Sequence, residues 1–409
     1  MDIEILEKAQ TLIDSLDNEI CNHCLGRKFS NVLDIDGNVK RGEAIRKELN
    51  LTTPNTCSVC NNIFSKIDES LVLKVLDKID FLNIEFETFL VGSKVPKSII
   101  EKDESLDESF DFDVENIKKE INREVGKLLE SSLKKEVEFE KQDIVVTVNF
   151  NDFLNDNIKV RIQINPIFIE GKYNKFLRGI PQTKWPCSKC KGKGCLECDF
   201  TGKQYKESVE ELISETVLEY SKGFEAKFHG AGREDIDVLM LGSGRPFVLE
   251  IKEPKIRKLD LKFLEKKINE INDKKTAYHN LKFVERKRKA EIKISSPDTF
   301  KVYKALVTCS EEFDKDKLNN LSKLSDINQL TPTRVLHRRA DKVRSKQVKK
   351  INTEIVDSTT FEMIVKTDGG LYIKELISGD NGRTKPSVSD ILGIDCLCKQ
   401  LDVVEVSEK

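Results

Sequence analysis

The sequence predicts an α+β protein that folds as more than one domain. Its 409 residues exceed what a single hydrophobic core usually organises. Segments whose apolar residues follow helical spacing are interleaved with shorter segments whose apolar residues alternate, which is typical of helices and half-buried strands. Two groups of Cys-x-x-Cys pairs also indicate metal-bound modules.

Charge is nearly balanced overall but unevenly distributed along the chain. The formal net charge is -2, although 34% of the residues are charged. Acids crowd the segment 101–115, the acidic stretch, which we interpret as solvated surface, whereas bases crowd two stretches of the second half. Local basic surfaces can therefore bind nucleic acid despite the neutral total. The N-terminus does not resemble a signal peptide and no segment is apolar over a membrane span, so we expect a cytoplasmic protein with no membrane partner.

The first module is predicted to be a helix followed by a zinc site. Apolar residues within residues 1–20 follow helical spacing. Two cysteine pairs follow, with 32 residues between them, and they are Cys21, Cys24, Cys57 and Cys60. Four thiolates suit one closed tetrahedral zinc site, whereas a redox role needs only one pair. His23 is a further candidate ligand, but with four cysteines available it is expected to face solvent.

The middle of the chain is predicted to form a small α+β domain. Its predicted helices and strands are the helices 71–81 and 114–133 and the strands 83–91, 143–150 and 158–165. The domain ends in a further strand and a basic loop within residues 166–183. Tyr173, Lys175 and Arg178 in this segment either contact RNA or form an ordinary polar edge.

A second cysteine cluster follows this domain. Its members are Cys187, Cys190, Cys195 and Cys198, with four residues between the two pairs. Glycines relax the turns so that the two pairs can bind one ion, and three lysines keep the exterior positive. Together with the first cluster, the chain is therefore expected to bind one or two structural zinc ions. Cys309, Cys396 and Cys398 lack such a pattern and are interpreted as buried apolar residues.

Residues 228–252 are interpreted as a hairpin that carries catalytic carboxylates, with a Gly-Ser-Gly turn at its tip. In one interpretation Asp235 acts as a nucleophile or base, and Arg233, two residues earlier, contacts phosphate or an everted base. The other is a magnesium-dependent nuclease in which Asp237, Glu250 and Lys252 converge on one face. A solvated surface hairpin is the third reading.

The remaining elements can be assigned from their spacing and charge. We predict helices at 208–222 and 255–273, an edge strand with a basic tip at 282–294, and strands at 360–367 and 371–376. Between Arg334 and Lys350 there are eight Lys or Arg and one acid, which suits phosphate contacts. Lys374 falls in an apolar segment, so a carboxylate partner is expected.

Several motifs together resemble one enzyme family. The early cysteine pairs, Gly232-Arg233-Glu234-Asp235 and Leu371-Tyr372-Ile373-Lys374 are among them, and further matches are Pro166 to Thr183, Thr331 to Asp341 and Gly382 to Ser387. The chain resembles the archaeal tRNA pseudouridine synthases that carry an N-terminal zinc-containing THUMP domain and modify the T-arm. The match covers nearly the whole chain.

The resemblance implies both the domain order and the activity. It places a zinc module at 1–64, a THUMP-like domain at 65–186, the Cys-rich junction at 187–202, and a catalytic domain with a mixed, mainly antiparallel sheet at 203–409. The implied reaction isomerises uridine to pseudouridine in the T-loop, at uridines 54 and 55. It consumes no organic cofactor, so zinc would be structural. The implied partner is tRNA, held at its T-arm and acceptor end by a monomer with no obligate protein partner.

The resemblance also assigns roles to single residues. Asp235 matches the catalytic aspartate, which attacks or deprotonates the nucleoside, and Arg233 matches the arginine that occupies the space of the flipped uridine. Tyr303 would stack on the base, and Lys374 would pair with the aspartate. Tyr372 shares the face of Lys374 by strand alternation, so it is interpreted as a second wall of the pocket, and Leu401 is expected to close its apolar floor. Plain core packing is the alternative for both tyrosines. The residues implied to contact RNA in the basic segment and near the C-terminus are Arg334, His337, Arg338, Arg339, Arg344 and Arg383. Two rival functions are the nuclease described above and a non-catalytic THUMP and zinc adaptor that carries tRNA.

Overall fold

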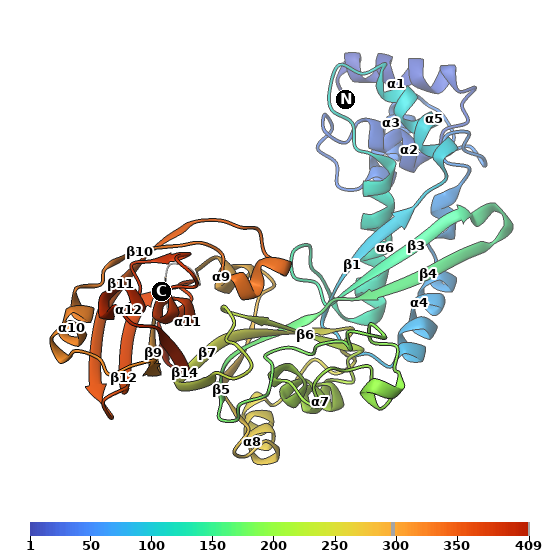
Figure 1. Cartoon of the computed structure of the whole chain (residues 1–409). Helices are drawn as coiled ribbons and strands as arrows, with labels where there is room; N and C mark the ends of the chain where they lie inside the picture. Colours follow the sequence, from blue (N-terminus) through green and yellow to red (C-terminus); the bar gives the residue numbers. More distant parts are fainter. Residues whose placement is uncertain (296–298, 408–409) are drawn as a thin grey trace. The chain divides into compact units, whose positions relative to one another are not determined.

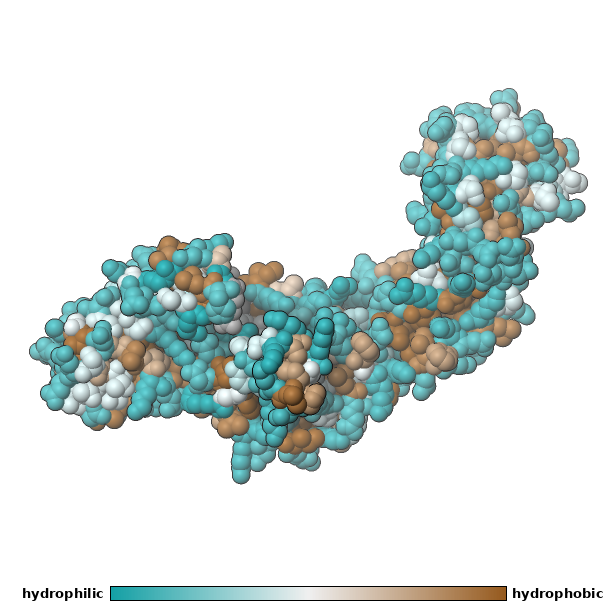
Figure 2. Space-filling view, turned by 45° about the vertical axis from the view of Figure 1, so that its right-hand side comes forward, coloured by the Kyte–Doolittle hydropathy of each residue, from teal (hydrophilic) through white to brown (hydrophobic). Residues whose placement is uncertain are grey.

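The computed structural model describes residues 1–295 and 299–407, which form two compact units (Figure 1). Unit 1 comprises Met1–Pro166 and Glu253–Arg257, and unit 2 comprises Ile167–Lys252 and Lys258–Lys409. Each unit has its own hydrophobic core, and the α+β class is confirmed. Hydrophilic side chains cover most of the face seen in Figure 2, with hydrophobic ones in separate patches. None of the described helices combines the length and the apolar character needed to cross a bilayer.

Some of the helices of unit 1 begin at a polar side-chain cap. The Asp2 carboxylate accepts a hydrogen bond from the Glu4 amide (3.1 Å), and Asp68 accepts one from the Ser70 amide (3.0 Å). The helices are α1 (Ile3–Ser15), α2 (Asn22–Lys28), α3 (Asn38–Glu48), α4 (Glu69–Leu82), α5 (Lys97–Asp107) and α6 (Ile117–Leu133), with 3-10 turns η1 (Ile63–Lys66) and η2 (Phe153–Asn155). The helices predicted near residues 1–20, 71–81 and 114–133 are therefore confirmed as α1, α4 and α6.

The described strands of unit 1 form a sheet in the order β2-β1-β3-β4. The strands are β1 (Thr88–Lys94), β2 (Glu136–Val137), β3 (Ile144–Asp152) and β4 (Asn157–Ile164). Alternate residues of β3 from Ile144 to Phe150 are buried, as predicted for that strand. The predicted strand at 83–91 begins only at Thr88, because Asn83 ends α4 in a left-handed conformation and the next residues form the connection.

A buried ion-pair network lies inside unit 1. The Arg27 guanidinium is fully buried and lies 2.6 Å from a carboxylate oxygen of both Asp103 and Glu120. His23 is half-buried, and its Nδ1 lies 2.9 Å from Glu120 Oε1. The interpretation of the acidic stretch as solvated is therefore wrong at Asp103, and His23 does not simply face solvent. The physical reason is that a buried cation requires buried anionic partners.

The described strands of unit 2 form a ten-stranded sheet in the order β13-β10-β11-β12-β9-β14-β7-β5-β8, with β6 paired to β7. The strands are β5 (Ile167–Lys175), β6 (Glu225–Gly230), β7 (Leu239–Lys252), β8 (Thr276–Val284), β9 (Phe300–Cys309), β10 (Asp326–Gln329), β11 (Arg344–Ile355), β12 (Thr360–Asp368), β13 (Thr384–Lys385) and β14 (Cys396–Val406). Within this described sheet β14 and β7 run parallel and the other pairs are antiparallel, as the resemblance implied.

Helices and 3-10 turns complete unit 2. They are η3 (Leu196–Cys198), α7 (Val209–Ser221), α8 (Leu261–Ile271), α9 (Arg288–Ser295), α10 (Lys315–Asn319), η5 (Asn320–Lys323), η6 (Thr333–Arg338), α11 (Ile373–Ser378) and α12 (Val388–Leu392). The helices predicted at 208–222 and 255–273 correspond to α7 and α8, and the strand predicted at 360–367 corresponds to β12.

The boundary between the units falls earlier in the chain than predicted. β5 pairs with both β7 and β8, so residues 167–186 contribute to unit 2 rather than to the THUMP-like domain predicted at 65–186. Nearly every residue of β5 is buried, which is typical of a central strand covered on both faces. The basic residues near its end had suggested the polar edge of the preceding domain.

The predicted hairpin tip in residues 228–252 is wrong. β7 continues through the Gly-Ser-Gly sequence, where Gly242 and Gly244 have φ values of +61° and +79°. The pairing with β5 shifts register at this point. The glycines therefore form a bulge inside one long strand, and the loop that carries Asp235 instead joins β6 to β7.

Two of the predicted strands are also wrong. The segment at 371–376 leads into α11, which begins at Ile373 and whose buried residues are Ile373, Glu375, Leu376 and Ile377. A short apolar run fits a helix or a strand equally well, so spacing alone could not decide. The segment at 282–294 contains the end of β8 and then α9.

Candidate active site

Asp235 lies in the loop 231–238 between β6 and β7, which we call the catalytic loop because it carries the predicted catalytic aspartate. The two strands pair until Gly230 stands opposite Phe247, so the loop leaves the sheet at a defined point. Gly232 has a φ of +84°, a left-handed conformation that suits glycine. The Val238 amide donates a hydrogen bond to the Asp235 carbonyl (3.1 Å). Asp235 is therefore presented on a short turn between two paired strands.

The catalytic loop is anchored by the residue that precedes Asp235. Glu234 is buried, and its carboxylate accepts a hydrogen bond from the Tyr173 hydroxyl (2.8 Å) and lies 2.9 Å from Arg245 Nε. Arg245 Nη1 also donates to the Ala231 carbonyl (2.9 Å). Burial opposes the charge of Arg245, but Glu234 raises its pKa above the usual value. Tyr173 is fully buried in this anchor, so the prediction that it contacts RNA is wrong.

Two further cations hold the backbone of the catalytic loop. The fully buried Lys175 Nζ donates to the Ile236 carbonyl (3.2 Å), and burial lowers its pKa. Arg178 Nη1 donates to the carbonyls of Asp237 (2.6 Å) and Leu401 (3.0 Å). Arg178 thus joins the loop to β14. Its contact with RNA stays a prediction.

Two cations flank the Asp235 carboxylate. Arg334 Nη1 lies 2.9 Å from Asp235 Oδ2, and Lys374 Nζ lies 3.6 Å from the same oxygen. Lys374 makes a closer contact with Asp237 (2.7 Å), and although burial raises the pKa of Asp237, this contact lowers it below its ordinary value. The predicted pairing of Lys374 with Asp235 is therefore present. Arg334, which was assigned only to RNA, makes the shorter contact.

Arg334 is itself fixed by residues of α11 and its N-cap. Its Nε lies 2.6 Å from Glu375 Oε1, and Glu375 is buried. Burial opposes the charge of Arg334, but Glu375 and then Asp235 raise its pKa. The Tyr372 ring lies 5.8 Å from the Arg334 guanidinium, and the Tyr372 hydroxyl accepts a hydrogen bond from Arg339 (2.8 Å).

A cavity of about 330 Å³ opens beside Asp235. Its volume lies in the range of sites for small ring-shaped ligands. All six residues that the sequence predicted to be catalytic line it: Arg233, Asp235, Tyr303, Tyr372, Lys374 and Leu401. Burial raises the pKa of Tyr303 to about 12, so its phenol stays neutral at physiological pH. The cavity offers aromatic surfaces next to a paired carboxylate.

The other residues predicted to contact RNA differ in position. Arg383 Nη2 donates to the Thr331 carbonyl (2.9 Å), and Arg344 Nη1 donates to the Thr331 hydroxyl (2.9 Å). Both arginines therefore brace the segment before β11. His337 is exposed, whereas the side chain of Arg338 lies outside the described residues. Contact of these residues with RNA stays a prediction.

The nuclease arrangement is not compatible with β7. Asp237 precedes this strand and Glu250 lies near its other end, so the two carboxylates are on the order of 30 Å apart at the usual rise per residue. Glu250 is paired with His229 (2.9 Å), and Lys252 is paired with Glu225 (2.6 Å). One metal ion cannot bind both carboxylates.

Comparison with known proteins identifies the family. The family profile described as "Pus10, C-terminal" matches residues 168–407, and the profile "Pus10 THUMP domain, archaeal" matches residues 72–149. The tRNA pseudouridine synthase Pus10 of Methanothermobacter marburgensis is 49% identical over 406 residues, which cover 99% of this chain and 100% of the relative. The chain belongs to the Pus10 family. Pus10 proteins of Methanocaldococcus jannaschii and Pyrococcus furiosus are 49% and 40% identical, over 86% and 98% of this chain and 75% and 98% of their own lengths.

The family assignment confirms the resemblance read from the sequence. The Pus10 THUMP match lies in unit 1 and covers β1, α5, α6, β2 and most of β3. The Pus10 C-terminal match extends through the sheet of unit 2 and contains the whole catalytic loop. Membership of a family of named enzymes also removes support from the non-catalytic adaptor.

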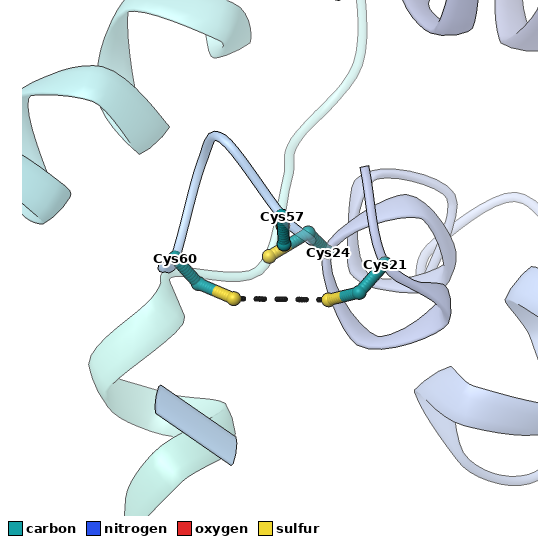
Figure 3. Close-up of side chains that lie close together, drawn as sticks. All are labelled: Cys21, Cys24, Cys57 and Cys60. Carbon is teal, nitrogen blue, oxygen red and sulfur yellow. Dashed lines mark hydrogen bonds between the residues drawn. The ribbon is translucent and has the colours of Figure 1, made fainter. Parts of the chain in front are cut away.

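The first cysteine cluster of this Pus10 chain can hold a metal ion. The sulfur atoms of Cys21, Cys24, Cys57 and Cys60 lie within 4.8 Å of one another. Figure 3 shows the side chains converging from the start of α2 and from the turn before η1. The Cys21 and Cys60 sulfurs are 3.7 Å apart. Four thiols at one point suit a tetrahedral metal ion better than a redox pair.

The second cysteine cluster can hold a metal ion as well. The sulfur atoms of Cys187, Cys190, Cys195 and Cys198 lie within 4.8 Å of one another. The Gly194 amide donates to Cys190 Sγ (3.2 Å) and the Gly202 amide to Cys198 Sγ (3.3 Å). Burial raises the pKa of Cys198, but amide donors lower it to about 7, which favours the thiolate that binds metal.

Sequence reasoning missed several residues of the Pus10 site. Trp185 lines the cavity, and the guanidinium of Arg233 lies 4.9 Å from the centre of its ring. Glu234 and Arg245 form the buried anchor, and Glu375 holds Arg334. Only Glu234 carried a usable signal, because it adjoins the candidate aspartate. The other three are brought to the site by the fold.

Proposed function

We propose that this Pus10 chain isomerises uridine to pseudouridine in the T-loop of tRNA, at uridines 54 and 55, with Asp235 as the catalytic aspartate. The observation that carries the proposal is the convergence on one cavity of the six residues that the sequence predicted to be catalytic, in a chain that is 49% identical to a named tRNA pseudouridine synthase. Asp235 is the carboxylate of this cavity that two cations contact directly.

The proposed reaction is an exchange of bonds within one nucleoside. The bond between uracil N1 and ribose C1′ breaks, the uracil rotates in the cavity, and a bond between C5 and C1′ forms. The proton on C5 is lost and N1 gains one, so atoms and electrons balance without an oxidant or a co-substrate. Asp235 acts as nucleophile or base in its carboxylate form, and Arg334 and Lys374 balance its charge.

The walls of the cavity suit a uracil ring. Tyr303 on β9 and Tyr372 before α11 offer aromatic faces, and Leu401 on β14 offers an apolar contact. We assign stacking on the target base to Tyr303, since a neutral phenol at pH 7 can lie against the ring without burying a charge. We assign to Arg233 the space that the flipped uridine leaves in the RNA.

Binding of the rest of the tRNA is assigned to both units. We propose that the basic segment, including Arg334, Arg339 and Arg344, lies along the T-arm, and that the THUMP domain of unit 1 binds the acceptor end. We propose that zinc occupies both cysteine clusters, where it would supply a fixed tetrahedral crosslink and no catalytic chemistry.

The test is an assay of product on unmodified tRNA transcript. Asp235→Asn should abolish pseudouridine formation and leave tRNA affinity within about threefold, because one carboxylate among many phosphate contacts adds little to binding. The exposed Asp357→Asn, in the turn between β11 and β12, is the matched control and should keep full activity. Site-resolved detection of pseudouridine in EDTA, applied too briefly to strip zinc, also excludes magnesium chemistry. Normal product from Asp235→Asn would refute the assignment.

A further inference from the structure

The strongest feature that the proposed function leaves unused is Trp185, the single tryptophan of the chain. It is half-buried in the wall of the active-site cavity. The Arg233 guanidinium lies 4.9 Å from its ring centre, within the distance of a cation–π contact. Its ring edge also meets Tyr205, with ring centres 5.6 Å apart at 80°. Tyr205 therefore contacts the edge of the Trp185 ring, and Arg233 covers one of its faces.

The second cysteine cluster supports Trp185 through the backbone. The Cys187 amide donates to the Gly202 carbonyl (2.8 Å), Pro186 forms a β-bridge with Lys203, and the Gln204 amide donates to the Trp185 carbonyl (2.9 Å). These three contacts form a short ladder that closes the base of the cysteine knuckle, residues 187–198. Trp185 is the end of this ladder and lies two residues before the knuckle begins at Cys187.

We propose that Trp185 is a positioning residue that holds Arg233 at the cavity, and that the metal-bound knuckle sets the position of Trp185. In the RNA-free enzyme the indole face carries the guanidinium beside the catalytic loop. When RNA binds, the arginine is released into the space of the flipped uridine. The inference rests on the proposed function, because Arg233 has that task only if a uridine is flipped.

The contact reduces the cost of organising a long, flexible cation. An arginine side chain loses rotamer freedom when it is fixed in RNA, and part of that loss is already paid when it lies on a ring at the cavity wall. The contact is therefore expected to increase the rate at which the flipped state forms rather than the overall affinity for tRNA. The knuckle would then position Trp185 at the active site in addition to closing a loop.

Fluorescence of the single tryptophan tests the contact without any assay of activity. Arg233→Ala should increase acrylamide quenching of Trp185, up to about twofold, since one ring face becomes uncovered. Lys267→Ala is the matched control, because it removes a similar contact with Tyr220 (4.6 Å), a residue that does not line the cavity. Unchanged quenching in Arg233→Ala would overturn the contact.

The knuckle is tested with Cys195→Ser. This variant should bind one metal equivalent fewer, shift the Trp185 emission to longer wavelength and lower its anisotropy. If the emission and anisotropy stay at wild-type values after the metal is lost, the knuckle does not set the position of Trp185. That result would overturn the second half of the proposal.

Single-turnover kinetics test the positioning role. Trp185→Ala should slow pseudouridine formation by about tenfold, while Trp185→Phe keeps a ring and loses about threefold. The dissociation constant for tRNA should stay within about twofold in both. Adding Trp185→Ala to Arg233→Ala should cause no further loss, because the two residues act together. A wild-type rate in Trp185→Ala, or a loss confined to tRNA binding, would overturn the role.

These outcomes are separate from the fate of the proposed function. If wild-type protein forms no pseudouridine, the function fails, yet the quenching data still decide whether Arg233 covers Trp185. If wild type is active and Asp235→Asn is not, a normal rate in Trp185→Ala counts against the positioning role alone. Circular dichroism of Trp185→Ala and Trp185→Phe confirms that both are folded.

Discussion

The buried pair of Glu234 and Arg245 makes a sharp prediction about the catalytic loop. Arg245→Met removes the cation that lies 2.9 Å from the Glu234 carboxylate and donates to the Ala231 carbonyl. Arg245 is 1% exposed, so water cannot take its place. The variant leaves a buried carboxylate with the Tyr173 hydroxyl as its remaining partner in this anchor.

The expected cost follows from the burial of both ions. Removing one member of a buried ion pair costs about 3–5 kcal/mol, because the other charge is left uncompensated. In a unit of more than 200 residues each kcal/mol lowers the Tm by about 2–4 °C, so the Tm of unit 2 should fall by roughly 6–20 °C. Combining Arg245→Met with Glu234→Gln should recover part of this loss, since no buried charge then remains.

The assay is urea denaturation followed by tryptophan fluorescence, which reports on unit 2 because Trp185 is the single tryptophan. The matched control is Lys304→Met, which breaks a partly exposed pair with Glu362 (2.9 Å) and should cost less than about 1 kcal/mol. If Arg245→Met costs no more than Lys304→Met, the reasoning about the anchor is refuted.

Two further predictions concern a buried lysine and the first cysteine cluster. Burial, and then Arg245, lower the pKa of Lys301 to about 7 from its ordinary 10.5. Between these two pH values the unfolded chain binds a proton that the folded chain does not. The stability of the folded chain therefore rises with pH in this range. Lys301→Met should therefore stabilise unit 2 at pH 7 by about 1–4 kcal/mol, and this gain in stability should shrink toward pH 10.5. Urea titrations at pH 7 and 10 check this prediction, and a gain in stability that is independent of pH would contradict it. Cys57→Ser should remove one metal equivalent and lower the Tm of unit 1, measured by circular dichroism, while Trp185 emission stays constant. Retention of both metal equivalents would show that these cysteines do not form the site.

Patterns that repeat over short distances were predicted well from the sequence. The alternation in β3 and the helical spacing in α6 each reflect one buried face, so the pattern is carried by neighbouring residues. The two cysteine clusters were also predictable, because a tetrahedral site needs four thiols in paired turns. The Gly-Ser-Gly bulge was not, since glycine serves a turn and a bulge equally and the choice depends on how β5 pairs with β7.

The site itself was predictable only as far as motifs reached. Arg334 was assigned to RNA because it begins a basic segment, yet it lies 2.9 Å from a carboxylate that is 99 positions earlier in the chain. No local pattern carries that contact. It arises because the segment after β10 lines the cavity while Glu375 in α11 holds the guanidinium. Arg334 therefore balances the charge of Asp235 from within the segment that is proposed to meet RNA, so the charge around the proposed catalytic aspartate and the proposed docking of the RNA depend on the same side chain.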